Sequence, residues 1–376
     1  MHILHVVGAR PNFMKVAPVL HALSRRAGVQ QTLVHTGQHY DVSMSDVFFT
    51  QLGIPQPDIN LNVGSGSHAR QTAEIMTRFE PVVLEQKPDI VLVYGDVNST
   101  VAAALVCAKL GIRIGHVEAG LRSFDWKMPE EINRVVTDRI SDHLFTPSQD
   151  GDENLRREGV APEKIHFVGN VMIDSLVRLL PAALERSFEG LPQKYALVTL
   201  HRPSNVDDSA MLGQILGALR SISREMGVVF PVHPRTRQRI ADAGLHVEGL
   251  HLLEPLPYIE FLALQRGAAV VITDSGGIQE ETTWLGVPCL TVRNNTERPV
   301  TVTLGTNVIV GQDMQRLETE LARIAAGHLR QATIPPLWDG RAGERIADVL
   351  QDLFGGAARR NDTVEEAAAP AGVAGR

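Results

Sequence analysis

The segment from Thr273 to Thr301 carries the residues of this chain that are best suited to binding a phosphorylated ligand. An apolar run ends at residue 273, a turn without bulky side chains follows, and residues 278–284 can begin a helix. The amides in the first turn of a helix have no intrahelical acceptor and therefore suit a phosphate group. The turn consists of Ser275, Gly276 and Gly277. The structural alternative is that the two glycines merely let the chain turn.

Two further polar residues support the ligand-binding interpretation of this turn. Glu281 lies inside the predicted helix, where its carboxylate could accept hydrogen bonds from sugar or ribose hydroxyls. Arg298 lies in the following loop and could make a second, charge-assisted contact to phosphate. The segment therefore indicates a site for a nucleotide-sugar diphosphate.

Three carboxylates in the first half of the chain lie where predicted strands end or helices begin. Asp96 follows the apolar run 89–94 and could act in catalysis or serve only as a turn or N-cap residue. Glu118 ends another apolar run, where a buried carboxylate is costly without a function or a partner, and Arg122 is the candidate partner. Glu131 lies at a predicted helix start, where an acidic residue favours the helix dipole.

Basic side chains also follow predicted strands, in both halves of the chain. Arg10 and Lys15 come after the first strand, and His201 comes after the first strand of the second half. A histidine can titrate near neutrality, so His201 could serve as an acid or a base. His233 lies beside prolines and is better explained as a turn residue.

Length and charge limit the classes of function. A chain of 376 residues exceeds the size at which one core usually keeps growing, so we expect two domains. The net charge of −7 and the scattered Lys and Arg residues argue against nucleic-acid binding. No run reaches the roughly 18 apolar residues of a membrane span, and the first residues lack the features of a secretory signal. We therefore expect a cytoplasmic protein with no membrane partner.

Cysteine and histidine spacing gives no sign of a metal site or a cofactor. Cys107 and Cys289 fall in apolar segments far apart, as small core residues do in a reducing compartment. The histidines show no HExxH or similar spacing, so we expect no metal. No GxGxxG follows the first strand, which argues against a tightly bound dinucleotide.

Short apolar strands alternate with helical segments, the pattern of doubly wound parallel α/β sheets. The first series of expected strands covers residues 2–7, 31–36, 89–94, 113–117 and 142–146. The second series covers residues 195–200, 227–232, 269–273 and 288–292. Two such sheets facing each other create a cleft at the carboxyl ends of their strands, which is where open α/β sheets bind ligands.

The break between the two series predicts a hinge near Gly169 and Asn170. The expected division is one Rossmann-like domain over residues 1–169 and a second over residues 170–340. A helix is expected over residues 341–354, followed by a disordered Ala/Gly-rich tail over residues 355–376.

Nine motifs, in this order, resemble those of the non-hydrolysing UDP-N-acetylglucosamine 2-epimerases. They are GARPxxxK, QHYD, GDxNST, HVEAGLRS, PEExNR, GNVxID, HRxxN, TDSGGIQEE and TERPVTV. The resemblance runs from about residue 1 to residue 355. It implies the GT-B arrangement of two Rossmann-like domains, with the C-terminal helix packing back toward the first domain and the nucleotide held mainly by the second. It also implies a UDP-sugar substrate and a homodimer.

The resemblance also implies roles for individual residues. It assigns the catalytic site to Asp96, Glu118, Glu131 and His201, with Arg10 and Lys15 beside them. It assigns UDP binding to Ser275, Gly276, Gly277, Glu281 and Arg298. The reaction implied is elimination of UDP, proton removal from sugar C2 by a carboxylate to give a 2-acetamidoglucal, and re-addition of UDP after reprotonation on the other face. Which carboxylate serves which face stays open.

The chain departs from the common form of the family at three places. The first motif reads GARPNFMK instead of GTRPEAIK, and Pro203 and Ser204 replace an arginine and a glutamate. GARP together with QHYDVSMSDVFF is also similar to epimerases of UDP-2,3-diacetamido-2,3-dideoxyglucuronate, which makes that sugar the main alternative substrate. Asp41 stands where the allosteric members carry glutamine, so we expect a weak or absent second UDP-sugar site. The residues that match the rest of that site are Gln38, Arg70, Glu131, Arg202 and His233.

Two other classes share parts of this pattern. A GT-B glycosyltransferase would use the same fold and UDP site with an acceptor substrate, and a nucleotide-sugar sensor would need no acids in the first domain. The presence of Asp96, Glu118 and Glu131 together favours the epimerase.

Overall fold

A parallel seven-stranded sheet forms the first half of the molecule in the computed structural model. The structure describes residues 1–37 and 49–365, without the side chains of Arg10 and of residues 355–365. The strand order is β3-β2-β1-β4-β5-β6-β7. The strands are β1 (His2–Val7), β2 (Gln30–His35), β3 (Ile59–Asn60), β4 (Ile90–Tyr94), β5 (Ile114–Val117), β6 (His143–Thr146) and β7 (Ile165–Phe167). The helices between and after them are α1 (Arg10–Leu23), α3 (His68–Gln86), α4 (Asn98–Leu110), α5 (Pro129–Ile140), α6 (Gln149–Arg157), the 3-10 turn η1 (Pro162–Lys164) and α7 (Val171–Leu184).

A parallel six-stranded sheet forms the second half, with the order β10-β9-β8-β11-β12-β13. Its strands are β8 (Tyr195–Thr199), β9 (Gly227–Pro231), β10 (Leu250–Leu253), β11 (Val270–Thr273), β12 (Cys289–Thr291) and β13 (Asn307–Ile309). Its helices are α8 (Pro203–Val206), α9 (Ser209–Ile222), α10 (Pro234–Asp242), α11 (Tyr258–Gly267), α12 (Gly276–Leu285), α13 (Pro299–Thr303) and α14 (Met314–Ala325). The chain ends in α15 (Ala342–Glu365).

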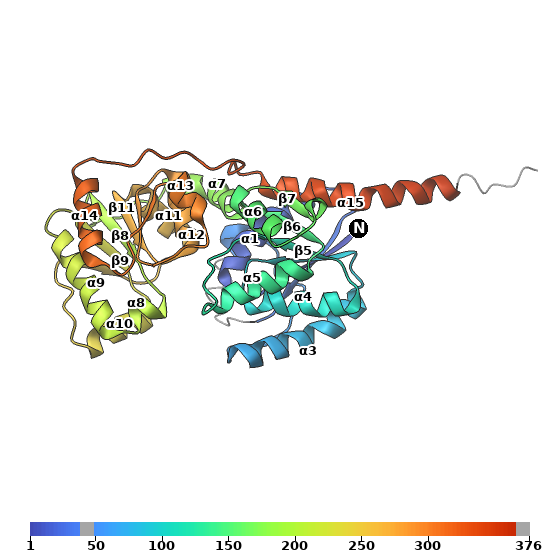
Figure 1. Cartoon of the computed structure of the whole chain (residues 1–376), viewed down its shortest axis with the longest axis horizontal. Coiled ribbons are helices and arrows are strands. Elements are labelled where there is room, and N and C mark those ends of the chain that lie inside the picture. The colour runs from blue at the N-terminus through green and yellow to red at the C-terminus, as the bar shows by residue number, and fades with distance from the viewer. Residues whose placement is uncertain (38–48, 366–376) are drawn as a thin grey trace, which may run out of the picture.

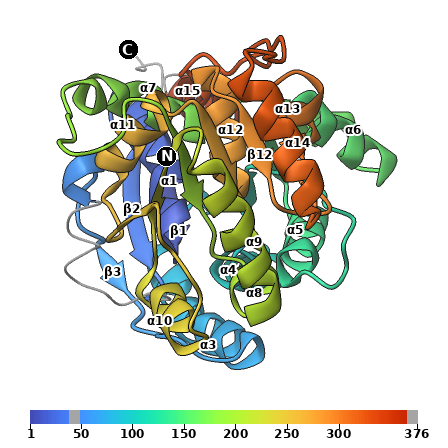
Figure 2. The same cartoon turned by 90° about the vertical axis from the view of Figure 1, so that its left-hand side faces the viewer.

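The two sheets with their helices form two lobes that lie side by side in Figure 1, the second sheet on the left and the first on the right. Figure 2 views the molecule from the left-hand end, with the second lobe in front. Strand order reverses between β1 and β4 in one sheet and between β8 and β11 in the other. These switch points are where doubly wound sheets bind ligands. The expected GT-B-like arrangement of two Rossmann-like domains is confirmed, while the exact domain boundaries stay a prediction.

Every strand expected from an apolar run is present, within one residue at each end. The structure adds β3, β7, β10 and β13, which the sequence analysis did not predict. These strands have two to four residues and lie toward the sheet edges, where one neighbour is missing. Most of their residues are only half-buried, so their sequences show no strong apolar run.

The chain passes between the lobes twice, and the two passages touch. Gly169 has φ +88, and a Cβ atom there would lie 2.1 Å from the carbonyl oxygen of Leu337. The indole of Trp338 is buried, and its Nε1 donates to the carbonyl of Pro147 in the first lobe at 2.9 Å. Only glycine fits at position 169, because the returning chain occupies the space of a side chain.

Helix α15 lies along the first lobe, against α1, and extends to Glu365. Asp174 of α7 accepts hydrogen bonds from the backbone N–H groups of Ala342 and Gly343 at 3.1 and 2.7 Å, which satisfies two free amides at the start of α15. The helix therefore continues past residue 354, where the sequence analysis ended it. The segment GGAARRNDTVEE contains several good helix formers, which explains the continuation. Among the described residues, no helix is long and apolar enough to cross a membrane.

Candidate active site

A cavity of about 230 Å³ lies between the lobes, at the switch points of both sheets. Helices α1 and α7 supply one wall, and α11, α12 and the loop before α13 supply the other. It is lined by Pro11, Met14, Lys15, Met172, Tyr258, Ser275, Gly277, Ile278, Glu280, Glu281 and Arg298. Five of these were predicted to bind substrate, namely Lys15, Ser275, Gly277, Glu281 and Arg298. The structure therefore brings together residues separated by more than half of the chain.

Glu118 lies directly beside this cavity and joins its two walls. Its Oε1 is 2.7 Å from Nζ of Lys15 and 3.4 Å from a terminal nitrogen of Arg298. Its Oε2 is buried and has no hydrogen-bond partner within the described residues. The backbone at Glu118 has φ +74, a left-handed conformation that costs a non-glycine residue about 1–3 kcal/mol. The carboxylate is thus held in a strained position with one oxygen unused.

Arg298 is the centre of a buried ionic network. Its guanidinium also contacts Glu280 at 3.0 Å and Glu297 at 2.5 Å. Burial alone would lower the pKa of Arg298, but the surrounding carboxylates raise it, so this residue stays charged. Gly276 is required beside it, because a Cβ atom there would lie 2.4 Å from a guanidinium nitrogen.

Glu280 shares the guanidinium group of Arg298 with Glu118 and Glu297. Burial raises its pKa, Arg298 opposes that shift, and the charge of Glu118 adds to it. Its Oε2, like that of Glu118, is buried without a hydrogen-bond partner in the described part of the chain. A ligand that brings hydrogen-bond donors would satisfy both oxygens.

Glu281 occupies the next position of α12 and also lines the cavity. Its Oε1 accepts a hydrogen bond from the Tyr258 hydroxyl at 2.9 Å, and its Oε2 has no partner within the described residues. Burial raises the pKa of Glu281 to about 7. A half-satisfied, buried acceptor at the cavity wall suits a hydroxyl group of a ligand.

Asp96 and Glu131 meet through a residue that the sequence analysis did not single out, Arg134. Arg134 is 2.5 Å from Asp96 and 2.6 Å from Glu131. Glu131 also accepts hydrogen bonds from the backbone N–H and hydroxyl of Ser123 and from the N–H of Phe124. Burial alone would raise the pKa of Glu131, but these bonds and Arg134 hold it below its usual value. Both oxygens of Glu131 are therefore occupied, whereas Asp96 remains partly exposed.

His201 is held by Asp274, a second residue that the sequence analysis missed. Nδ1 of His201 is 2.9 Å from Asp274, and the His201 side chain is 59% exposed. Asp274 is fully buried and also accepts from the N–H of Arg202 at 3.0 Å and the side-chain amide of Asn205 at 2.9 Å. Asp274 thus orients the ring and leaves Nε2 as the nitrogen available to a ligand. No contact joins His201 to Glu118 within the described residues.

Several structural alternatives raised by the sequence are resolved. Arg122 pairs with Asp138 at 2.7 Å and Glu158 at 2.7 Å, so it is not the partner of Glu118. Asp96 does not cap a helix, because Val97 is the N-cap residue of α4. His233 caps α10 by accepting from the N–H of Arg235 at 3.3 Å, which is a structural role.

The predicted second site is only partly described. Arg70 is exposed on α3, and Arg202 contacts the sulfur of Met128 across the lobes at 3.9 Å. Gln38 and Asp41 lie outside the described residues, as does the side chain of Arg10. The weak second site therefore stays a prediction.

The sequence offered little signal for the residues that it missed. Glu280, Glu297 and Arg134 lie next to residues that were singled out, but only the fold shows which neighbours turn inward. Asp274 ends an apolar strand, as Glu118 does, and that position could have identified it. Within the described residues, no group of three or more His, Cys, Asp and Glu side chains could hold a metal ion.

Comparison with known proteins identifies the family to which this chain is similar. The family model described as UDP-N-acetylglucosamine 2-epimerase matches residues 21–351. A UDP-N-acetylglucosamine 2-epimerase of Methanococcus maripaludis is 42% identical over 92% of this chain and 97% of its own length. A UDP-2,3-diacetamido-2,3-dideoxy-D-glucuronate 2-epimerase of Pseudomonas aeruginosa is also 42% identical, over 94% of this chain and all of its own length.

A solved structure extends the similarity to three dimensions. The crystal structure of Methanocaldococcus jannaschii UDP-GlcNAc 2-epimerase in complex with UDP-GlcNAc and UDP matches with a TM-score of 0.87 and 40% identity. The match covers 93% of this chain and 99% of that one. With this likeness over nearly the whole chain, the protein belongs to the UDP-N-acetylglucosamine 2-epimerase family and is an epimerase, an isomerase by class.

Proposed function

We propose that this chain interconverts UDP-N-acetylglucosamine and UDP-N-acetylmannosamine by inverting C2, through elimination and re-addition of UDP. The observation that carries the proposal is Glu118, a strained buried carboxylate with one oxygen held by two cations and the other unused. It lies beside a cavity whose opposite wall is the start of α12. The names of the relatives support the choice of a UDP-sugar.

The diphosphate would bind where the positive groups of the cavity converge. Lys15 comes from the first lobe, Arg298 from the second, and the N–H groups of Gly276 and Gly277 begin α12. Helix N-termini and charged side chains together favour phosphate. Glu281 would accept hydrogen bonds from ribose hydroxyls through its unpartnered Oε2.

The binding of diphosphate would also change Glu118. Lys15 and Arg298 now share its Oε1, and phosphate oxygens would compete for the same two cations. A carboxylate that loses a cationic partner becomes a stronger base. Substrate binding and activation of the base would therefore occur together.

The chemistry begins at the anomeric carbon, because the hydrogen on C2 has no adjacent carbonyl to acidify it. The C1–O bond breaks, its electron pair leaves with UDP, and positive charge develops next to C2. A carboxylate then takes the C2 hydrogen as a proton, and the C–H electrons form the C1–C2 double bond of a 2-acetamidoglucal. Proton delivery to the other face of C2 and return of the UDP oxygen to C1 complete the inversion.

Glu118 and Asp96 are the carboxylates best placed to exchange the proton. Glu118 has the unused oxygen, and Asp96 keeps part of its side chain exposed. Both oxygens of Glu131 accept hydrogen bonds from Ser123, Phe124 and Arg134. The role of Glu131 is therefore to position Arg134 and, through Arg134, Asp96. His201 would donate from Nε2 to the leaving phosphate in its imidazolium form, which Asp274 would stabilise through Nδ1.

UDP-2,3-diacetamido-2,3-dideoxyglucuronate is the second candidate substrate. Its epimerase from Pseudomonas aeruginosa matches this chain with the same 42% identity as the UDP-N-acetylglucosamine 2-epimerase of Methanococcus maripaludis. Identity alone therefore does not separate the two sugars. The reaction at C1 and C2 is the same for both.

Incubation in deuterated water tests the proposal directly. The protein receives UDP-N-acetylglucosamine alone, or the diacetamido uronate alone, and the products are followed by NMR and mass spectrometry. We expect gluco and manno epimers that both carry deuterium at C2, without any acceptor. Epimers without deuterium would rule out proton abstraction, and turnover of the uronate alone would establish the second substrate. No turnover of either sugar would favour a glycosyltransferase or a sensor.

Three expectations of the sequence analysis stay predictions. These are assembly as a homodimer, location in the cytoplasm, and a weak second UDP-sugar site that includes Asp41. The last would appear as hyperbolic forward kinetics and as a reverse reaction that needs no added UDP-N-acetylglucosamine.

A further inference from the structure

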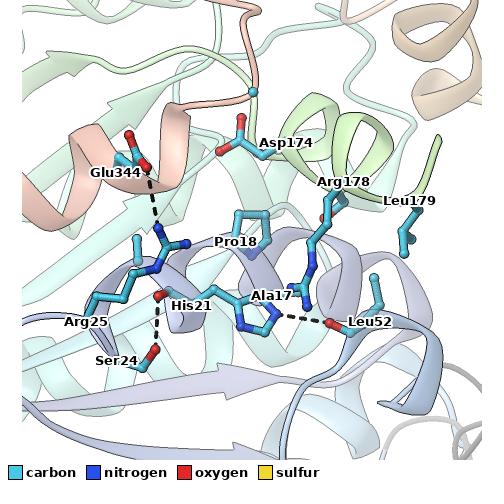
Figure 3. Close-up of a pocket in the computed structure, with 13 residues that line it drawn as sticks. Ala17, Pro18, His21, Ser24, Arg25, Leu52, Asp174, Arg178, Leu179 and Glu344 are labelled. Carbon is cyan, nitrogen blue, oxygen red and sulfur yellow. Dashed lines mark hydrogen bonds and ion pairs between the residues drawn. The ribbon is translucent and has the colours of Figure 1, made fainter. Parts of the chain in front are cut away.

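A second and larger cavity, of about 410 Å³, lies between the last turns of α1 and the middle of α7, under the start of α15 (Figure 3). It shares no lining residue with the cavity beside Glu118. Nothing in the proposed epimerase reaction uses it. Two of the helices that form it, α7 and α15, directly follow the two chain crossings between the lobes.

Two arginines reach this cavity from facing helices, Arg25 at the end of α1 and Arg178 on α7. Arg178 has no carboxylate within ion-pair distance among the described residues. Arg25 reaches Glu344 only at 3.7 Å, and Glu344 is closer to Arg341, at 2.9 Å. Both arginine side chains are exposed, so an anion from solvent can reach the two guanidinium groups that face this cavity.

The third basic residue of the lining, His21, does not add to the positive charge of the two arginines. Burial, then Arg178, then Arg25 lower the pKa of His21 to about 4. At neutral pH the ring is therefore uncharged, and its Nε2 lies 3.0 Å from the carbonyl oxygen of Leu52, to which it donates. His21 thus leaves its Nδ1 as a neutral polar atom in the cavity region and does not compensate the arginines.

Asp174, the second acidic residue in the wall beside Glu344, is also engaged. Asp174 accepts from the N–H groups of Ala342 and Gly343, and burial raises its pKa to about 6. Both oxygens of Asp174 face the start of α15, so Asp174 does not form an ion pair with either arginine. Leu52 and Leu179 form an apolar part of the wall on the side away from Arg25, and Ser24 and Ser175 add hydroxyl groups to the lining (Figure 3).

We propose that this cavity binds a small amphipathic anion, with a phosphate or carboxylate between Arg25 and Arg178 and an apolar group against Leu52 and Leu179. Paired guanidinium groups and an apolar wall are the usual composition of such pockets. A ligand there would contact α1, α7 and α15 at once. The inference goes beyond the proposed epimerase reaction and does not depend on it.

Phenyl phosphate is a suitable probe, because it combines a phosphate with an apolar ring. Its binding to the full chain is measured by calorimetry, with inorganic phosphate, benzoate and benzyl alcohol as separate arms. We expect saturable binding of phenyl phosphate, tighter than that of inorganic phosphate, and none of benzyl alcohol. Benzoate binding would show that a carboxylate can replace the phosphate.

Three variants locate the bound probe. Arg178→Leu should raise the Kd of phenyl phosphate at least tenfold, since it removes one of the two cations. Arg157→Leu, at a well exposed arginine of α6, should leave the Kd unchanged. Lys15→Met should also leave it unchanged, because a probe in the other cavity would respond to Lys15. The melting temperature of each variant checks that it is folded.

Four results would overturn the proposal. The first is equal Kd values in Arg178→Leu and Arg157→Leu, and the second is a Kd that changes only in Lys15→Met. The third is the absence of saturable binding. If inorganic phosphate binds as tightly as phenyl phosphate, the apolar wall plays no part and the amphipathic ligand is excluded.

Discussion

Glu118 and Glu131 are both buried and both paired with a basic side chain, yet their surroundings differ in one respect. Every oxygen of Glu131 has a donor from Ser123, Phe124 or Arg134. Glu118 has an unused Oε2 and a strained backbone. A saturated carboxylate stabilises the fold, whereas an unsaturated one retains capacity for a ligand or a proton. The difference separates two residues to which the family resemblance gives the same role.

The largest expected effect comes from Glu118→Gln. The amide keeps the size and some hydrogen bonding but cannot accept the C2 proton, so turnover should fall by roughly 10²-fold or more. UDP affinity should not fall, because the amide competes less than the carboxylate with phosphate for Lys15 and Arg298. The free energy of unfolding should fall less than in Glu131→Gln, because Glu118 has fewer hydrogen bonds to lose. Steady-state kinetics, UDP calorimetry and urea denaturation measure the three quantities. A loss of stability equal to that of Glu131→Gln would contradict the proposed difference between Glu118 and Glu131.

Glu131→Gln should instead lower both activity and stability. It removes the negative charge next to Arg134 and one acceptor for the Ser123 and Phe124 amides, which should reduce the free energy of unfolding by about 2 kcal/mol. Turnover should fall as well, since Asp96 depends on Arg134 for its position. Urea denaturation of both variants provides the measurement. Unchanged stability would mean that the hydrogen bonds accepted by Glu131 do not contribute to the free energy of unfolding.

Arg298→Lys tests the cation that links Glu118 to the phosphate site. Lysine keeps the charge among Glu118, Glu280 and Glu297, so the variant should fold, but it loses the planar fork of donors. UDP affinity should fall about tenfold, the lower range for a charge-assisted contact. Arg157→Lys on exposed α6 is the matched control for the substitution. If turnover falls while UDP affinity stays unchanged, Arg298 acts only through its contact with Glu118 and does not bind the phosphate.

The smallest effect is a pH dependence from Glu281, another buried carboxylate with an oxygen that has no partner among the described residues. Its pKa is raised to about 7, so the folded protein holds a proton that the unfolded chain releases near its ordinary value. Stability from this group is present at low pH and is lost as pH rises through 7. Wild type should lose about 1 kcal/mol relative to Glu281→Gln between pH 6 and pH 7.

Urea denaturation at these two pH values gives the Glu281 difference directly. Glu153→Gln, at an exposed position, serves as the control and should show no such change. An equal pH dependence in wild type and Glu281→Gln would place the charge of Glu281 in a more polar environment than its burial indicates.

The sequence predicted the fold better than it predicted the contacts of the site. Apolar runs such as 89–94 and 269–273 are buried on both faces, and burial is what makes a strand recognisable in the sequence. The short strand β3 has little burial and left no such pattern. Side chains at strand ends, such as Glu118, were found because polar residues are unexpected there.

Pairing between residues could not be predicted in the same way. Arg122 is the nearest arginine to Glu118 along the chain, but it faces Asp138 and Glu158. The actual partner in the other lobe, Arg298, is 180 positions away. Local spacing contains no information about which lobe faces which, so only the folded structure identifies the pair.

The contact between Gly169 and Leu337 also limits how the lobes can move. Two passages of chain, one leaving the first lobe and one returning to it, meet at Gly169 and Leu337, and Arg345 donates to the carbonyl groups of Val168 and Leu337. We expect lobes joined in this way to rotate about the junction more readily than they separate. Such a junction would let the cleft open for UDP-sugar to enter and close again in the same register. Lys15 and Arg298 would then meet the same phosphate group in every turnover.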